Sequence, residues 1–222
     1  MELKIVRNLL KANDDWAQKI RHLLLKHNIF SLNFIGSPGT GKTTILEKTI
    51  DNLRDDYSIL VLEGDIATTR DADRIQKHNV PAIQLLTEGS CHLSAHLVYQ
   101  SLEQIELSPV DFLFIENVGN LVCPSEFDIG ESAKIAVLSV PEGDDKILKY
   151  PKLFREATCF LLNKVDLLPY LDFDKSRIYE DLNKLNPQIT IFEISAKTGQ
   201  GMDSWNEWIR SHNKIAPASS IL

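Results

Sequence analysis

Residues 31–44 read SLNFIGSPGTGKTT, an apolar run followed by a loop with three glycines, a lysine and three threonines. Positions 36–43 match the G-x-x-x-x-G-K-T pattern, placed after a predicted strand and before a predicted helix, as a phosphate-binding loop requires. The glycines allow backbone N–H groups to converge on phosphate oxygens, and the helix that follows presents its positive end. This stretch predicts an α/β fold with a nucleotide site at the end of its first strand.

The rest of the chain alternates short apolar runs with helical segments. The strand-like runs are SLNFIG, SILVLEG, VPAIQLL, VDFLFIEN, AKIAVLSV, ATCFLLNK and QITIFEIS, and helical periodicity covers 43–54, 69–79, 92–105 and 201–212. Strands that are apolar on both faces are required by a parallel sheet covered by helices. We therefore predict a three-layer P-loop NTPase fold, with a mostly parallel sheet and helices on both faces.

The segments divide into one main domain and two extensions. We predict an N-terminal helical segment over 1–30 with a break around residues 13–15, a P-loop domain over 31–214, and a flexible tail over 215–222. The chain has no apolar run of about 20 residues and no signal-peptide pattern, so we expect a cytoplasmic location. A net charge of −7 argues against a nucleic-acid or membrane partner.

A site for phosphate and Mg²⁺ needs a positively charged side chain and oxygen ligands for the metal. The expected phosphate-loop residues are Gly36, Ser37, Pro38, Gly39, Thr40, Gly41, Lys42, Thr43 and Thr44. Lys42 supplies a point charge to the β- and γ-phosphates, and the Thr43 hydroxyl suits Mg²⁺. Acids end two predicted strands: Glu63 and Asp65 in VLEGD, and Glu116 in FLFIEN. We expect Lys42, Asp65 and Glu116 to be catalytic, and Thr43, Asp65 and Glu116 to bind Mg²⁺.

Two later motifs indicate which base is bound. The sequence Asn163-Lys164-Val-Asp166 follows one strand and Ser195-Ala196-Lys197 follows the last, so both lie at the ligand-binding edge of the sheet. The Asp166 carboxylate can accept hydrogen bonds from the two adjacent donors of guanine, which adenine lacks. Lys164 can cover the ring face, and backbone N–H groups of 195–197 can reach guanine O6. The motifs together predict GTP and GDP as ligands.

Longer strings resemble one family. The E-x-x-G form at Glu116 to Gly119 resembles the SIMIBI class of dimerising GTPases. The strings EGDIATTRDADRI, CHL, IENVGNLVCP, EGDDKILKYP and LNKVDLLP closely resemble the HypB family of hydrogenase nickel-incorporation GTPases, and the likeness runs from about Asn33 to Trp208. The resemblance implies slow GTP hydrolysis, a nucleotide-dependent homodimer, and nickel delivery to the large-subunit precursor of [NiFe]-hydrogenase alongside a small zinc-containing accessory protein.

The resemblance also implies a metal site. The family's interfacial metal ligands match Cys91, His92 and Cys123, and thiolate and imidazole groups suit Ni²⁺ or Zn²⁺ shared across a two-fold axis. His96 lies one helical turn after His92 and is an outside candidate. Cys159 is expected in the core. The first cysteine is Cys91, so the chain lacks the N-terminal cysteine-rich motif of many relatives, and high-affinity metal storage there is not expected.

Two features leave questions open. Glu88 stands where relatives commonly have a small residue, and it either changes the charge of the loop or adds a weak ligand. Because Cys123 is four residues beyond Gly119, we expect GTP and Mg²⁺ to order 65–73 and 116–123 and so to couple nucleotide to nickel.

Three alternatives compete with this interpretation. A urease-accessory GTPase shares the P-loop and the E-x-x-G form but has a Cys-x-His pair, whereas Cys91 and His92 are adjacent. A metal-storage protein with little GTPase activity would not need intact Lys42, Thr43 and Asp166. A translational GTPase would be expected to show a basic RNA-binding surface.

Overall fold

The computed structural model describes residues 2–65, 70–87 and 89–213. The expectations for Glu88, for residues 66–69 and for the 215–222 tail concern positions outside these ranges. Within them, no helix is both long and apolar enough to cross a membrane.

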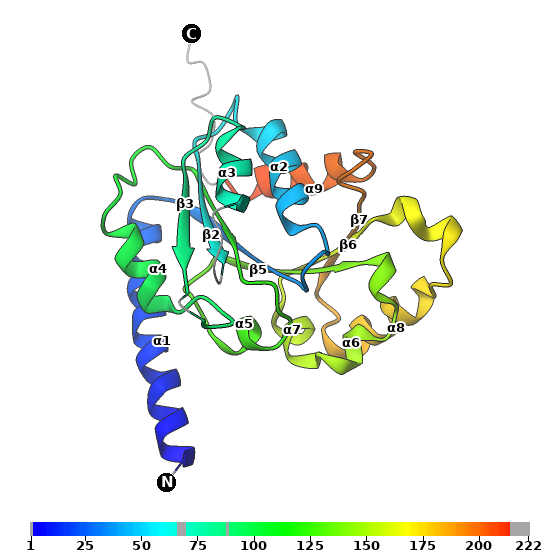
Figure 1. Cartoon of the computed structure of the whole chain (residues 1–222), viewed down its shortest axis with the longest axis horizontal. Helices are drawn as coiled ribbons and strands as arrows, with labels where there is room; N and C mark the ends of the chain where they lie inside the picture. Colours follow the sequence, from blue (N-terminus) through cyan, green and yellow to red (C-terminus); the bar gives the residue numbers. More distant parts are fainter. Residues whose placement is uncertain (1, 66–69, 88, 214–222) are drawn as a thin grey trace.

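A single seven-stranded sheet forms the centre of the molecule (Figure 1). Its order is β3-β2-β4-β1-β5-β6-β7, and every neighbouring pair is parallel. The strands are β1 (Phe30–Ile35), β2 (Ile59–Asp65), β3 (Ala82–Leu86), β4 (Phe112–Glu116), β5 (Ala133–Ser139), β6 (Cys159–Asn163) and β7 (Thr190–Glu193). The predicted doubly wound α/β fold is confirmed, and all the parallel strands end at the same edge of the sheet.

Helices cover both faces of this sheet (Figure 1). They are α1 (Glu2–Lys26), α2 (Lys42–Leu53), α3 (Arg70–Gln76), α4 (Ala95–Leu102), α5 (Cys123–Glu126), α6 (Lys146–Lys149), α7 (Pro151–Glu156), α8 (Lys175–Leu185) and α9 (Met202–Ser211), with 3₁₀ segments η1 (Val140–Glu142) and η2 (Val165–Tyr170). Helices α2, α3 and α9 pack on one face, and α1 and α4 pack with α5 to α8 on the other.

The sequence pattern explains the two cores. Alternate strand residues, such as Phe112 and Phe114, face α2 and α9 in one core, whereas Leu113 and Ile115 face α1 and α4. Side chains on a strand alternate between faces, so a strand buried on both sides reads as a continuous apolar run. Cys159 is fully buried in the first core, which confirms the expectation for this cysteine.

The predicted break at residues 13–15 is wrong, because α1 runs unbroken from Glu2 to Lys26. Asn13 is buried within the helix and uses its side chain on other elements: Nδ2 donates to the Asp128 carbonyl at 2.7 Å, and Oδ1 accepts from Ala95 N at 2.9 Å. Asparagine is a poor helix former because its side chain competes for nearby backbone groups. Here those hydrogen bonds are made to distant segments, so the helix continues.

We expect Asn13→Ala to lower the stability of the fold by about 2 kcal/mol, because two buried backbone groups lose their partners. The melting temperature, measured by calorimetry, should fall by about 5 °C for a chain of this size. Asp14→Ala is the matched control, since Asp14 is the exposed neighbour on the same helix. Equal melting temperatures for the two variants would contradict this role of Asn13.

Candidate nucleotide and metal site

The phosphate loop connects β1 to α2 at the carboxyl edge of the sheet. Gly39 and Gly41 have φ values of +82° and +96°, which glycine adopts without strain. A Cβ on Gly41 would lie 2.5 Å from Asn163 Nδ2, so this position also needs the absence of a side chain. No side chain caps α2, whereas Ser94 caps α4 and Asp174 caps α8. The uncapped N–H groups of α2 suit an anionic ligand.

Lys42 and Thr43 begin α2 and are both buried. Lys42 Nζ donates to the Gly36 carbonyl at 3.1 Å and lies 3.9 Å from Glu116 Oε1. The Thr43 hydroxyl donates to that same Glu116 oxygen at 3.1 Å. The predicted cation, hydroxyl and carboxylate are therefore adjacent, although Glu116 lies more than seventy residues further along the chain.

A second carboxyl group stands beside Glu116. Glu63 on β2 pairs in register with Glu116 on β4, and both side chains are buried. In the described structure Glu63 Oε1 and Glu116 Oε2 have no hydrogen-bond donor. Burial and the neighbouring Glu116 carboxyl raise the pKa of Glu63 to about 10, so the pair holds a proton at neutral pH. Buried carboxyl oxygens without donors also fit a hard divalent cation such as Mg²⁺.

These groups line a pocket of about 560 Å³. Its other walls include Asp65 at the end of β2, Gly119, Lys164 and Arg74. Arg74 on α3 donates to Glu47 at 2.6 Å and lies 3.4 Å from the Thr44 hydroxyl. Arg74 was not among the predicted site residues, and its only sequence signal is its place in the EGDIATTRDADRI string.

The two base motifs meet at one end of the phosphate loop. Asn163 Nδ2 donates to the Thr40 carbonyl at 2.8 Å, and Lys164 Nζ donates to the Gly39 carbonyl at 2.6 Å. The Ser195 hydroxyl donates to Asp166 Oδ1 at 2.6 Å. The structure therefore brings the phosphate loop, the 163–166 motif and the 195–197 motif together.

The backbone amides of the last motif are partly used inside the protein. Ser195 N donates to the Gln200 carbonyl at 2.9 Å, and Ala196 N donates to Asn163 Oδ1 at 3.2 Å. Of the three amides expected near a guanine oxygen, Lys197 N–H is the one without an internal acceptor in the described structure.

The candidate soft-metal ligands lie on two segments that face each other. Cys91 and His92 precede α4, and Cys123 begins α5. The Cys91 thiol is close enough to Cys123 to share a hydrogen bond, and this contact raises the pKa of the Cys123 thiol. The His92 ring stacks on Phe127 with centroids 3.8 Å apart and planes 14° apart. Partial burial lowers the pKa of His92, which favours the neutral imidazole that binds metals.

Among the described residues of one chain, no three His, Cys, Asp or Glu side chains are grouped so that they could hold a metal ion. His92 Nδ1 lies 4.0 Å from Cys91 Sγ and 3.2 Å from the Ser90 hydroxyl. His96 is directed elsewhere, because its ring packs 4.8 Å from the ring of Trp16 on α1. One chain thus offers part of a coordination shell rather than a complete one.

Comparisons with known proteins show the family to which the chain belongs. Residues 31–193 match the family model described as CobW/HypB/UreG, nucleotide-binding domain. The chain is 45% identical over 207 residues to the hydrogenase maturation factor HypB of Rhizobium leguminosarum bv. viciae, covering 93% of this chain and 69% of that protein.

Two crystal structures have the same fold. HypB from Archaeoglobus fulgidus superposes with a TM-score of 0.85 at 36% identity, covering 91% of this chain and 98% of that one. HypB from Helicobacter pylori, solved in complex with nickel, has a TM-score of 0.85 at 38% identity, covering 93% and 99%. The chain therefore belongs to the CobW/HypB/UreG family of nucleotide-binding proteins, within its group of HypB hydrogenase maturation factors.

Proposed function

We propose that this chain is a slow GTPase whose nucleotide state controls a nickel site during [NiFe]-hydrogenase maturation. One observation carries the proposal: the segment after β4 leads from the phosphate pocket to the cysteine pair. It starts at Glu116, beside Lys42 and Thr43, and it ends at Cys123, beside Cys91. Between them Gly119 touches the phosphate loop, where a Cβ would lie 2.8 Å from Pro38 Cγ.

The nucleotide half of the proposal assigns roles to buried groups. Lys42 stabilises charge on the β- and γ-phosphates, and Thr43, Asp65 and Glu116 hold Mg²⁺, with Glu63 behind them. Mg²⁺, when bound, supplies a Lewis acid beside the phosphates. Asp65 orients the metal or the attacking water. The carboxyl groups are held by strand ends rather than by a loop, which favours pre-organisation.

Guanine recognition is assigned to Asp166. Its Oδ1 is held by the Ser195 hydroxyl, which fixes the plane of the carboxylate before a base arrives. The Lys197 N–H is the donor available for guanine O6, and the Lys164 stem covers the ring. A base that lacks adjacent donors would leave the Asp166 carboxylate unpaired.

The metal half concerns a cargo ion. Cys91, His92 and Cys123 of one chain supply part of a coordination shell, and the same residues of a second chain complete it across a two-fold axis. Ni²⁺ is the favoured ion because the similar Helicobacter pylori protein was solved with nickel, and Zn²⁺ suits the same ligands. We further propose a GTP-dependent homodimer in the cytoplasm that works with a small zinc-containing accessory protein on the hydrogenase large-subunit precursor.

A urease-accessory role remains a second candidate, because a similar Helicobacter pylori protein is described as a hydrogenase/urease maturation factor. A test of nickel transfer from this chain to each apo-enzyme separates the two. Transfer to hydrogenase precursor alone supports the first proposal.

Lys42→Ala should lower kcat/KM for GTP hydrolysis at least about a hundredfold, because the buried charge beside the phosphates is lost. Phosphate release measured with GTP and Mg²⁺ gives the rate. Lys48→Ala is the control, since Lys48 is exposed on the same helix. A Lys42→Ala rate within threefold of the Lys48→Ala rate would contradict the assignment.

Asp166→Asn should weaken GTP binding about a hundredfold, because one of the two acceptors for the guanine donors is replaced. The Asn oxygen still accepts from Ser195, so the fold is retained. Titration of fluorescent GTP and ATP analogues measures the preference, with exposed Asp172→Asn as the control. Unchanged GTP affinity in Asp166→Asn would overturn the base assignment.

Cys91→Ala and Cys123→Ala should each weaken Ni²⁺ binding at least about a hundredfold, more than loss of an outer partner costs. Cys159→Ala should bind Ni²⁺ as the wild type does, because that thiol is buried in the core.

The Ni²⁺ affinity of the wild type should fall as the pH is lowered, since the raised pKa of Cys123 means that the metal must displace a proton. Calorimetric titration gives the affinities, and equal binding by Cys91→Ala and Cys159→Ala would rule out the assignment.

A further inference from the structure

The Cys91–His92 segment is anchored by the residue that follows it. The Leu93 side chain is fully buried and packs over Gly64, where a Cβ would lie 2.8 Å from Leu93 Cγ. Its backbone N–H donates to Asn117 Oδ1 at 3.2 Å. The position of His92 therefore depends on a side chain from the end of β4.

Asn117 directly follows Glu116 and is only 1% exposed. Its Oδ1 also accepts from Val118 N at 3.0 Å. Because both of these donors are backbone N–H groups, the orientation of the amide is fixed, and Asn117 Nδ2 donates to Asn33 Oδ1 at 3.1 Å. Every polar atom of this buried amide thus has a partner.

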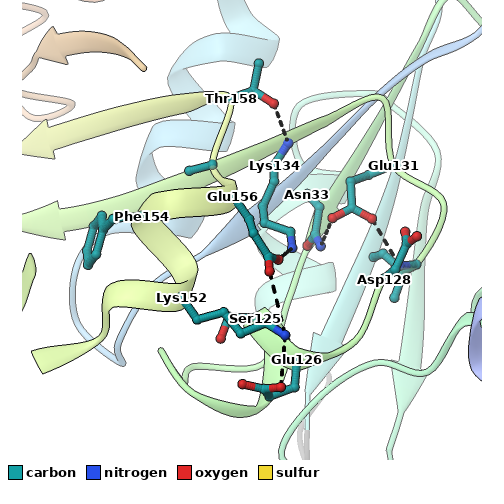
Figure 2. Close-up of polar contacts among 12 residues, drawn as sticks. Asn33, Ser125, Glu126, Asp128, Glu131, Lys134, Lys152, Phe154, Glu156 and Thr158 are labelled. Carbon is teal, nitrogen blue, oxygen red and sulfur yellow. Dashed lines mark hydrogen bonds and ion pairs between the residues drawn. The ribbon is translucent and has the colours of Figure 1, made fainter. Parts of the chain in front are cut away.

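The hydrogen bonds continue from Asn33 to Glu131 (Figure 2). Asn33 on β1 is fully buried, and its Nδ2 donates to Glu131 Oε1 at 3.2 Å. The other Glu131 oxygen accepts from Ile129 N at 3.0 Å. Ile129 lies two residues after Phe127, whose ring stacks on His92. Asn117 thus bonds directly to the segment that carries Cys91 and His92. Through Asn33 and Glu131 it is also connected to the residues that follow α5, the helix that carries Cys123.

We propose that Asn117 is a positioning residue of the metal site, holding His92 and α5 in fixed relation to the Glu116 end of β4. This inference rests on the proposed function and identifies a second, buried route from the nucleotide pocket to the metal ligands, beside the 119–123 loop. Asn117 acts through Leu93 and through Asn33. Because Asn117 bonds to Leu93 N with one end of its amide and to Asn33 Oδ1 with the other, the His92 segment and α5 are expected to move together with β4.

The chemistry of the position explains why an amide is required. The site offers two N–H donors on one side and one acceptor, Asn33 Oδ1, on the other. An aspartate would place an acceptor against that acceptor, and an apolar residue would leave buried N–H groups unpaired. Asn33 also needs an amide, because its Oδ1 accepts from Asn117 and its Nδ2 donates to Glu131.

The test uses Ni²⁺ titrations of the full chain with GDP and with a non-hydrolysable GTP analogue, both with Mg²⁺. In the wild type the two Ni²⁺ affinities should differ. In Asn117→Ala and Asn117→Asp they should agree within about twofold, with Ni²⁺ bound about tenfold more weakly and nucleotide affinity changed less than threefold, in line with typical coupling energies. Ni²⁺–thiolate absorption reports the binding directly.

Thr49→Val serves as the stability control. Thr49 accepts a buried hydrogen bond from Trp205 Nε1 at 2.9 Å on the opposite face of the sheet. Loss of this hydrogen bond should lower stability as the loss of the Asn117 amide does. The difference in Ni²⁺ affinity between the GDP and GTP-analogue states should nevertheless persist. Loss of that difference in Thr49→Val would attribute the effect to general destabilisation and overturn the inference.

A double variant tests the route itself. In Asn117→Asp combined with Glu131→Gln, the Asn33 amide can flip, donate to the new aspartate and accept from the new glutamine, whose oxygen still accepts from Ile129 N. Glu131→Gln alone should also lose the nucleotide dependence, because its NH₂ group would face either Asn33 Nδ2 or Ile129 N, both of which are donors. In the double variant the dependence should return. If both single variants lose it and the double variant does not recover it, the Asn33–Glu131 branch is wrong.

The remaining outcomes separate the two proposals. If the wild type shows the nucleotide dependence and both Asn117 variants keep it, the positioning role is overturned and the proposed function stands. If the wild type binds Ni²⁺ equally with both nucleotides, the proposed coupling fails and this inference fails with it.

Discussion

The parallel register of β2 and β4 places Glu63 directly beside Glu116, and the rest of the pocket is arranged around this pair. Two buried carboxyl groups repel each other when both are ionised, so they need a shared proton, a cation or nearby donors. Thr43 and Lys42 at the start of α2 meet that need from one side. A pair of acids that requires positive charge thus lies next to a loop suited to phosphate, and the proposed Mg²⁺–nucleotide complex would meet both requirements.

The opposite face of the same strand ends is organised by hydrogen bonds among two side-chain amides, the Glu131 carboxyl group and backbone N–H groups. Strand side chains alternate, so Asn117 and Asn33 face α1 and α4 while Glu116 faces α2. A buried amide network is stabilising only when every member is satisfied, and here the backbone N–H groups of Leu93, Val118 and Ile129 complete it. Such a network has one correct arrangement, which makes it stiff.

The fold and the position of the phosphate loop between β1 and α2 were predictable from the sequence, since apolar strand runs and the glycine-rich loop are local patterns. The pairing of Glu63 with Glu116 was not, because it depends on the register of strands far apart in the chain. The predicted helix break at Asn13 was wrong for the same reason. Asparagine weakens a helix locally, but the hydrogen bonds of Asn13 to Asp128 and Ala95, both far away in the sequence, allow it within α1. The only sequence signal for Asn117 is its place in the IENVGNLVCP string, because its partners Leu93 and Asn33 lie far from it along the chain.

The location of the cysteines also follows from these constraints. Cys91 and Cys123 are partly exposed, whereas the residues that hold their segments are buried. A cargo ion must be released, so its ligands belong at a surface where a second chain or a recipient protein can reach them. In the proposed mechanism, the nucleotide state reaches that surface through packed and hydrogen-bonded groups that connect the two sites. Glu116 ends β4 and Asn117 directly follows it, with the two side chains on opposite faces of the sheet, so the Lys42–Glu116 pocket and the Asn117–Asn33–Glu131 network lie next to each other.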